Sequence, residues 1–421
     1  MSLTTLAKRF ESAAATLSIA GRTLLGLETN PVPTDWSHIT KVDPEGEKQI
    51  PLLFPSYLSH TSAVSVGGSQ DVTDESTEET FALLADSGAT AFHEPSESTH
   101  VTEQTREHAE FLAVPEVLNG DSEALVGTLG RGIDYVREDL GPELLERKIG
   151  FPLDGLFGDR ARDFIAGMMI EEAVFEAYII MNTDSAAARE ANVTEDDLLT
   201  AQQAKERALA AQHHLDSEII YLEYSGTFGG DEAVEILDAI DDGVSWSQIW
   251  YGGGLDNREN AERVLDAGAD AVVVGDVFHR VSTAEAELFE QARREFDDET
   301  PTAELREWVS EQIDAEDSDA VSYLSTIPAV EGPQERAVEY LAASIEFGLA
   351  VEAVGAALSD PTAEEIRTAV SSREFAIESA FRTVSGADAG RVEEVAAGLL
   401  AEQFDREMDE RSVATHFALT L

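Results

Sequence analysis

The sequence contains no cysteine among its 421 residues. This absence excludes disulfide bonds, catalysis by a thiolate, and zinc or iron–sulfur sites built on cysteine. The sequence also has no apolar run long enough to span a bilayer, and its first residues lack the compact apolar segment of a secretory signal. We therefore expect a cytoplasmic protein.

Basic residues are scarce as well. The 28 Lys and Arg residues face 84 Asp and Glu residues, and the net charge is -56. Because the acidic residues are spread along the whole chain, we interpret the surface as that of a halophile's protein, whose self-repulsion is screened by concentrated salt. Such a field disfavours binding to nucleic acid, which depends on Lys and Arg contacts to phosphate. Lysine occurs only at positions 8, 41, 48, 148 and 205, so Lys41, at a predicted strand end, stands out.

The stretch 219–227, IIYLEYSGT, is typical of a buried parallel strand that reaches the surface at its carboxyl end. Seven other short apolar segments share this character, and most end in glycine or a polar residue. We predict eight strands, at 38–43, 63–69, 90–95, 110–118, 176–182, 218–226, 248–254 and 271–277. Since each strand is apolar and crossovers separate them, the pattern favours an α/β fold, a closed (β/α)₈ barrel of the TIM type, over an open sheet.

The segments on either side of the predicted barrel read as helical. We divide the chain into an N-terminal helical arm (1–33), the barrel (34–285) and a C-terminal all-helical extension (286–421). The arm is locally basic and amphipathic, so it either packs on the fold or makes a transient contact with a membrane surface. The roles of both segments and the oligomeric state, including a homo-oligomer, stay open. The predicted helices are 195–214 within the barrel and 303–313, 334–358, 362–384 and 389–410 in the extension.

Glycines end the seventh and eighth predicted strands, at Gly252–Gly254 and at Gly275. This is the place where (β/α)₈ barrels often bind a phosphate through backbone N–H groups. The glycines would also suit a tight strand-to-helix turn without any ligand. Their position on neighbouring strands favours the phosphate site.

Asp43 and Ser69 end the first two predicted strands, close enough to share one oxygen-bound cation. Mg²⁺ takes one or two protein oxygens and leaves its other positions for water or substrate phosphates. Alternatively, Asp43 only opens the loop at Pro44. Lys41 lies two residues before Asp43, so the pair points into the barrel mouth or forms a simple ion pair.

Glu223 ends the sixth predicted strand and could act as a general base on a substrate hydroxyl. Tyr221 shares its face, two residues earlier. A structural ion pair between Glu223 and Lys41 is the alternative interpretation. His213 and His214 end a predicted helix without a carboxylate pattern, and we interpret them as capping or solvent-facing residues.

Five strings occur at barrel-strand intervals: KVDP, VGGS, YLEYSG, YGGG and VVVGD. In this order they resemble geranylgeranylglyceryl phosphate synthases, a prenyltransferase family that includes bacterial heptaprenylglyceryl phosphate synthase. The resemblance covers roughly 35–281. It implies a (β/α)₈ barrel that uses Mg²⁺ to join sn-glycerol 1-phosphate to geranylgeranyl diphosphate, the first ether-bond step of archaeal membrane lipid biosynthesis.

The resemblance also implies roles for individual residues. Asp43 and Ser69 match the magnesium site, and Glu223 matches the residue that orients or deprotonates the glycerol hydroxyl. A short third crossover, here 96–109, is similar to the one that opens a groove for the prenyl chain in the family. The positions that match contacts to sn-glycerol 1-phosphate are Lys41, Tyr221, Leu222, Glu223, Tyr224, Ser225, Gly226, Gly254, Gly275 and Asp276.

Three features depart from the family pattern. Asp276 stands where the family usually has Asn, and a carboxylate there repels a phosphate. The first crossover contains prolines, and the helical extension after residue 281 is additional. Two alternatives therefore stay open, another phosphate-binding barrel enzyme of the isomerase type and an inactive descendant that binds prenyl lipid. The length of the prenyl chain is not encoded in a readable motif.

Overall fold

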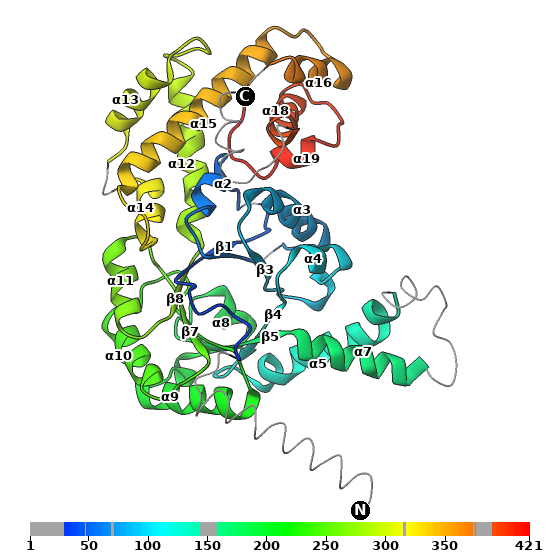
Figure 1. The fold of residues 1–421 in the computed structure, drawn as a ribbon, viewed down its shortest axis with the longest axis vertical. Coiled ribbons are helices and arrows are strands. Elements are labelled where there is room, and N and C mark those ends of the chain that lie inside the picture. Colours follow the sequence, from blue (N-terminus) through cyan, green and yellow to red (C-terminus); the bar gives the residue numbers. More distant parts are fainter. Residues whose placement is uncertain are drawn as a thin grey trace, which may run out of the picture.

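The computed structural model describes residues 29–46, 48–68, 71–143, 158–314, 317–373, 375 and 390–421. Its centre is one parallel sheet of eight strands in the order β3-β2-β1-β8-β7-β6-β5-β4 (Figure 1). A parallel bridge between His93 and Leu112 brings the two outer strands together, so the barrel is nearly closed. The predicted (β/α)₈ barrel is confirmed.

Each of the eight predicted strands is present, with small shifts at the ends. The largest shift at a strand start is in the fourth strand, which begins three residues later than predicted. The strands are β1 (His38–Val42), β2 (Ala63–Val66), β3 (Ala91–His93), β4 (Ala113–Val117), β5 (Val174–Ile180), β6 (Ile219–Glu223), β7 (Gln248–Gly252) and β8 (Ala271–Val274).

Strand residues alternate between the barrel interior and the layer under the helices, as the period of two requires. Aromatic rings fill the interior at the amino-terminal end of the barrel. Trp36 stacks on Phe92 and Phe111 with ring centroids 5.9 Å apart, and Phe92 lies 5.7 Å from Trp250. This packing closes the bottom of the barrel and leaves the carboxyl ends of the strands open for a site.

Helices connect the strands and surround the barrel (Figure 1). The third crossover is short, as predicted, and contains one helix of six residues. The helices of the barrel are α2 (Phe54–Leu58), α3 (Asp74–Leu84), α4 (Glu103–His108), α5 (Thr128–Tyr135), α7 (Gly158–Glu172), α8 (Ala186–Glu190), α9 (Ala201–Ala210), α10 (Gly230–Asp241), α11 (Arg258–Asp266) and α12 (Asp276–Ala292).

The helix predicted at 195–214 begins later than predicted. Thr200 is extended and accepts a hydrogen bond from the backbone of Gln203, while the Gln203 side chain accepts one from the Thr200 N–H. This capping box starts α9 at Ala201 and leaves Glu195–Asp197 as a separate 3₁₀ turn. The helix ends in a π-helical turn that contains both predicted histidines, His213 and His214.

The described residues after α12 contain helices and no strand. The extension has two short helices, α14 and α19, that the sequence did not predict. Its helices are α13 (Thr302–Gln312), α14 (Asp319–Thr326), α15 (Pro333–Ala356), α16 (Ala363–Ser371), α18 (Gly390–Gln403) and α19 (Arg411–Ala414). The part of the predicted helix 362–384 beyond 375 lies outside the described residues.

The predicted arm lies almost entirely outside the described residues, which begin at 29. The division of the chain at residues 33 and 285 stays a prediction, and α12 runs across the second position. Within the described ranges, no helix combines the length and apolar character needed to cross a bilayer. The predicted cytoplasmic location stays a prediction.

Candidate active site

A cavity of about 1220 Å³ opens at the carboxyl ends of the barrel strands. Six strands contribute residues to its wall, and Gly68 and Glu94 follow the other two, because parallel strands in a barrel end at the same face. The polar strand ends singled out in the sequence that the structure describes, among them Lys41, Asp43 and Glu223, therefore meet in one place. The wall includes Lys41, Asp43, Lys48, Glu94, Val117, Tyr178, Tyr221, Glu223, Gly254, Gly275 and Asp276.

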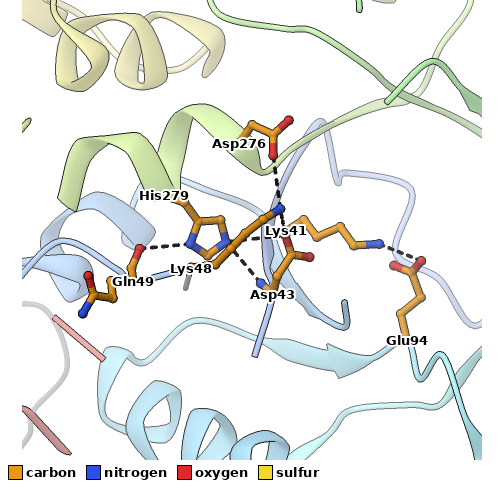
Figure 2. A network of polar contacts seen from close by, with 7 residues as sticks. All are labelled: Lys41, Asp43, Lys48, Gln49, Glu94, Asp276 and His279. Carbon is orange, nitrogen blue, oxygen red and sulfur yellow. Dashed lines mark hydrogen bonds and ion pairs between the residues drawn. The ribbon is translucent and has the colours of Figure 1, made fainter. Parts of the chain in front are cut away.

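Lys41 points across the mouth of the barrel to the third strand. Its Nζ donates to Glu94 Oε1 at 2.9 Å (Figure 2). The Glu94 carboxylate also accepts hydrogen bonds from Ser65 Oγ, at 2.7 Å, and from the Tyr178 hydroxyl. Burial opposes the charge of Lys41, but the carboxylates around it outweigh burial and raise its pKa. Lys41 is thus a fixed, charged ammonium, and the alternative pairing with Glu223 is not the one formed.

Asp43 follows β1 and is nearly buried, yet it reaches the cavity. Its carboxylate accepts a hydrogen bond from Lys48 Nζ at 2.6 Å, and the same ammonium lies 3.3 Å from Asp276 Oδ1 (Figure 2). Lys48 therefore joins the end of β1 to the start of α12. Sequence reasoning missed this residue, because it lies in an irregular loop and its partner Asp276 is 228 residues away.

His279, on α12, supports the same region. Its Nε2 accepts the backbone N–H of Asp43 at 3.2 Å, which places the ring proton on Nδ1, 3.0 Å from the carbonyl oxygen of Gln49 (Figure 2). Burial lowers the pKa of His279 and keeps the ring neutral. The imidazole fixes the backbone of Asp43 and the following loop relative to α12.

Glu223 ends β6 inside the barrel and is only 3% exposed. Its Oε1 accepts the backbone N–H of Ser225 at 3.1 Å. Burial raises the pKa of Glu223 to about 6. A carboxylate with this pKa can accept a proton near neutral pH and release it again, which suits a general base.

The glycine-rich turn after β7 packs directly against the end of β6. A Cβ added at Gly252 would lie 2.1 Å from the Tyr221 hydroxyl, and one added at Gly254 would lie 2.4 Å from the backbone nitrogen of Phe228. Gly254 also has a φ of 53°, in the left-handed region. Glycine is therefore required here by close approach and by conformation, and the turn exposes backbone rather than side chains to the cavity.

The residues from Tyr221 to Gly226 divide between two faces. Tyr221, Glu223, Ser225 and Gly226 line the cavity. The side chains of Leu222 and Tyr224 pack in the layer between the strands and the outer helices, where Tyr224 stacks on Tyr251 with ring centroids 6.0 Å apart. Any contact of those two residues with a substrate would come from the backbone.

The described wall carries much more negative than positive charge. Lys41, Lys48 and Arg280 are its cations, against eight carboxylates. A phosphorylated ligand needs additional cations in such a field. The acidic residues are Asp43, Glu45, Glu94, Asp184, Glu190, Glu223, Asp256 and Asp276.

A magnesium ion fits this arrangement with limited help from the protein. Asp43 presents a carboxylate oxygen to the cavity, and Mg²⁺ typically takes one or two such ligands together with substrate phosphates and water. The described residues contain no cluster of three or more His, Asp or Glu side chains arranged for a metal. Ser69, the second predicted ligand, lies outside the described residues.

Known proteins provide the identification. The family model described as the PcrB family matches residues 33–292, well over half of the chain. The chain belongs to the PcrB family. The match spans the barrel and the whole of α12, while residues 293–421 lie beyond it.

Two relatives illustrate the range of the family. The geranylgeranylglyceryl phosphate synthase of Haloquadratum walsbyi is 30% identical over 247 residues, which cover 58% of this chain and 88% of the relative. The heptaprenylglyceryl phosphate synthase of Bacillus pumilus is 30% identical over 248 residues, covering 58% and 91%. The resemblance seen in the five strings is confirmed.

Among solved structures, wild-type GGGPS from Thermoplasma volcanium matches with a TM-score of 0.41 and 19% identity. It covers 57% of this chain and 84% of that chain. The family assignment rests on the family model and the sequence relatives.

Proposed function

We propose that this chain is a Mg²⁺-dependent prenyltransferase that joins geranylgeranyl diphosphate to the 3-hydroxyl of sn-glycerol 1-phosphate and releases diphosphate. Membership of the PcrB family and the names of both relatives support the general reaction, the transfer of a prenyl group to a glyceryl phosphate. The reaction would form the first ether bond of archaeal membrane lipids. The observation that best supports the proposed chemistry is the position of Glu223, a buried carboxylate beside the glycine-rich turn.

Glycerol phosphate binds, in this proposal, at the carboxyl ends of β7 and β8. The phosphate lies near Gly254 and Gly275, where backbone N–H groups and the N-terminus of α12 favour an anion. Its glycerol hydroxyl then points toward Glu223 on the neighbouring strand β6. Lys41, fixed by Glu94, faces the same space from β1.

The transfer step needs one base and one leaving group. Glu223 accepts the proton of the 3-hydroxyl while the glycerol oxygen forms a bond to C1 of the prenyl group. The bond between C1 and the diphosphate oxygen breaks, and the diphosphate leaves with the electron pair. Mg²⁺, when bound at Asp43, supplies positive charge that stabilises the departing diphosphate. The high pKa of Glu223, caused by burial, matches the role of proton acceptor.

The opposite side of the cavity supports a prenyl substrate over a sugar phosphate. Beside β4 and β5 the wall becomes apolar, and the third crossover contributes only the short α-helix α4. An isomerase of small phosphates needs no such surface. The apolar residues of this wall are Pro115, Val117, Ala124, Ile180, Ala187 and Ala191.

A transfer assay tests the proposal. Purified protein in molar KCl is incubated with Mg²⁺, geranylgeranyl diphosphate and radiolabelled sn-glycerol 1-phosphate, and label is counted in an organic extract. The wild type and Lys205→Met, which changes a lysine on the outer helix α9, should both transfer label. Glu223→Ala and Asp43→Ala should not. A wild type that transfers nothing with any prenyl donor, while still binding prenyl diphosphate, would point to the inactive descendant instead.

A further inference from the structure

The ammonium of Lys48 lies between two carboxylates that belong to opposite sides of the site. Lys48 Nζ is 2.6 Å from Asp43 Oδ2, at the end of β1, and 3.3 Å from Asp276 Oδ1, at the start of α12 (Figure 2). One third of the lysine side chain is exposed, and it lines the cavity. A lysine in this position faces ligand and protein at once.

Asp276 creates an electrostatic problem that Lys48 can solve. It is the first residue of α12, next to Gly275, and its side chain is 63% exposed. The N-terminus of this helix would otherwise attract a phosphate, but a carboxylate beside it repels one. The ammonium of Lys48 offsets this charge where the phosphate would bind.

We propose that Lys48 donates a hydrogen bond to the phosphate of sn-glycerol 1-phosphate, and that residues 415–418 of the C-terminal extension position it. This inference rests on the proposed function for the identity of the ligand. It assigns a ligand contact to a residue that the family motifs do not include, and it gives the extension a part in the site.

The loop that carries Lys48 is held by the far end of the chain. Gln49 Nε2 donates to the carbonyl oxygens of Thr415, at 3.1 Å, and Phe417, at 2.8 Å. The next residue, Ile50, donates its N–H to the carbonyl oxygen of His416 at 2.9 Å. Three hydrogen bonds thus fix the backbone and side chain directly after Lys48.

Packing strengthens the same contact. The ring of Phe417 stacks on Phe54 of α2 with centroids 6.4 Å apart. Ser282 Oγ, on α12, accepts the N–H of Ala418 at 3.2 Å and donates to the carbonyl oxygen of Ile50 at 2.8 Å. The tail, the Lys48 loop and the helix that starts at Asp276 are therefore one hydrogen-bonded unit.

Calorimetric titration tests the role of Lys48 independently of turnover. The probes are sn-glycerol 1-phosphate and, separately, orthophosphate, added to the wild type, Lys48→Met, Lys48→Arg and Lys205→Met. Lys205 is a matched control, because it also pairs with an aspartate, Asp242, but outside the cavity. Lys48→Met should weaken binding of both probes by about 10- to 100-fold, the usual effect of losing a charge-assisted hydrogen bond. Lys48→Arg and Lys205→Met should stay within a few-fold of the wild type.

The titration separates this inference from the proposed function. If Lys48→Met binds both probes as tightly as the wild type, Lys48 is only an internal ion pair and the inference is wrong, whatever the transfer assay shows. If orthophosphate binding depends on Lys48 but the wild type transfers no prenyl group, the phosphate contact stands and the proposed reaction fails. Asp276→Asn should recover part of the affinity lost in Lys48→Met, since it removes the charge that Lys48 offsets.

Steady-state kinetics tests the positioning by the tail. Gln49→Ala removes the two side-chain hydrogen bonds to the tail, so it should raise KM for sn-glycerol 1-phosphate several-fold and leave kcat and KM for the prenyl diphosphate unchanged. In Lys48→Met the same change should add nothing, because both act on one contact. Gln202→Ala on α9 serves as the control. Additive effects of Gln49→Ala and Lys48→Met would overturn the positioning role.

Discussion

The ammonium of Lys41 lies 2.9 Å from a carboxylate oxygen of Glu94, so the ends of β1 and β3 are joined across the mouth of the barrel. This pairing leaves Glu223 with the backbone N–H and the side chain of Ser225 as its described hydrogen-bond partners. Burial outweighs the hydrogen bonds from Ser225 and the charge of Lys41, so the pKa of Glu223 stays raised. Because Glu94 pairs with Lys41, Glu223 keeps a raised pKa, which the proposed role of a general base requires.

The pH dependence of the reaction should report Glu223. Its pKa is about 6, so the carboxyl is protonated below this pH and cannot accept a proton. We expect kcat/KM, which reports groups of the free enzyme, to rise with pH through about 6 and to level off above it. Glu223→Gln should lower kcat by about 10²- to 10⁴-fold and remove this limb, with little change in glycerol phosphate binding. A limb that survives in Glu223→Gln would assign the base to another group.

Replacing Glu94 should move the same limb to lower pH. Glu94→Gln removes a negative charge near Glu223 and releases Lys41, whose positive charge lowers the pKa of Glu223. Both effects favour the ionised carboxylate, so we expect a shift of about one pH unit toward acid in the kcat/KM profile. Glu110→Gln, a matched change at an exposed carboxylate outside the cavity wall, is the control. An unchanged profile would show that the two carboxylates are not coupled.

Salt should strengthen substrate binding, which is the reverse of its effect on a basic anion site. The wall has eight carboxylates and three cations, so its field repels both phosphorylated substrates. Raising KCl from about 0.1 M to 1 M shortens the screening length from about 10 Å to about 3 Å. We expect KM for sn-glycerol 1-phosphate to fall several-fold over this range, with circular dichroism confirming that the protein stays folded. A KM that rises with salt would contradict the role of the acidic wall.

The turn after β7 should not tolerate a side chain. Gly254→Ala places a Cβ against the backbone of Phe228 at a φ of 53°, so the turn must move. We expect at least a tenfold loss of glycerol phosphate affinity by calorimetry, of the order that a displaced binding group produces. Gly130→Ala, in open space on α5, should bind normally and be slightly more stable. Normal binding by Gly254→Ala would place the phosphate elsewhere.

The apolar wall should affect the binding of the prenyl substrate and leave the binding of glycerol phosphate unchanged. Val117→Trp fills space beside β4, so it should raise KM for geranylgeranyl diphosphate and favour a shorter donor such as farnesyl diphosphate. Glycerol phosphate binding should be unchanged. Val126→Trp is the control, because Val126 is 61% exposed and outside the wall. If both substitutions have equal effects, or if Val117→Trp has no effect, the prenyl chain does not bind beside β4.

Local patterns in the sequence were sufficient to predict the barrel. Each strand is a short apolar run ended by glycine or a polar residue, and this signal does not depend on distant contacts. It also placed Lys41, Asp43, Glu223 and the glycines at one face. The helix was predicted to start at residue 195 because the acidic residues there are typical of a first helical turn. The capping box of Thr200 instead starts the helix at Ala201.

Contacts between distant segments could not be predicted in the same way. Lys48 lies in a loop without periodicity, and the loop takes its position from Asp276, His279 and the tail near Thr415. Only the folded chain brings these residues together. The period of two in a strand predicts that Leu222 and Tyr224 point to the opposite face from Glu223. The resemblance to the family does not show which of these residues would contact the substrate through the backbone.

In the proposed reaction, a prenyl group is transferred to glycerol phosphate beside Glu223, with loss of diphosphate. The most direct measurement follows both products in one incubation of the wild type with Mg²⁺, geranylgeranyl diphosphate and labelled sn-glycerol 1-phosphate. We predict that each mole of label entering the organic phase, identified by mass spectrometry as the geranylgeranyl ether of glycerol phosphate, is matched by one mole of diphosphate. Release of diphosphate without the ether, or label that stays in water as an isomerised phosphate, would contradict the account.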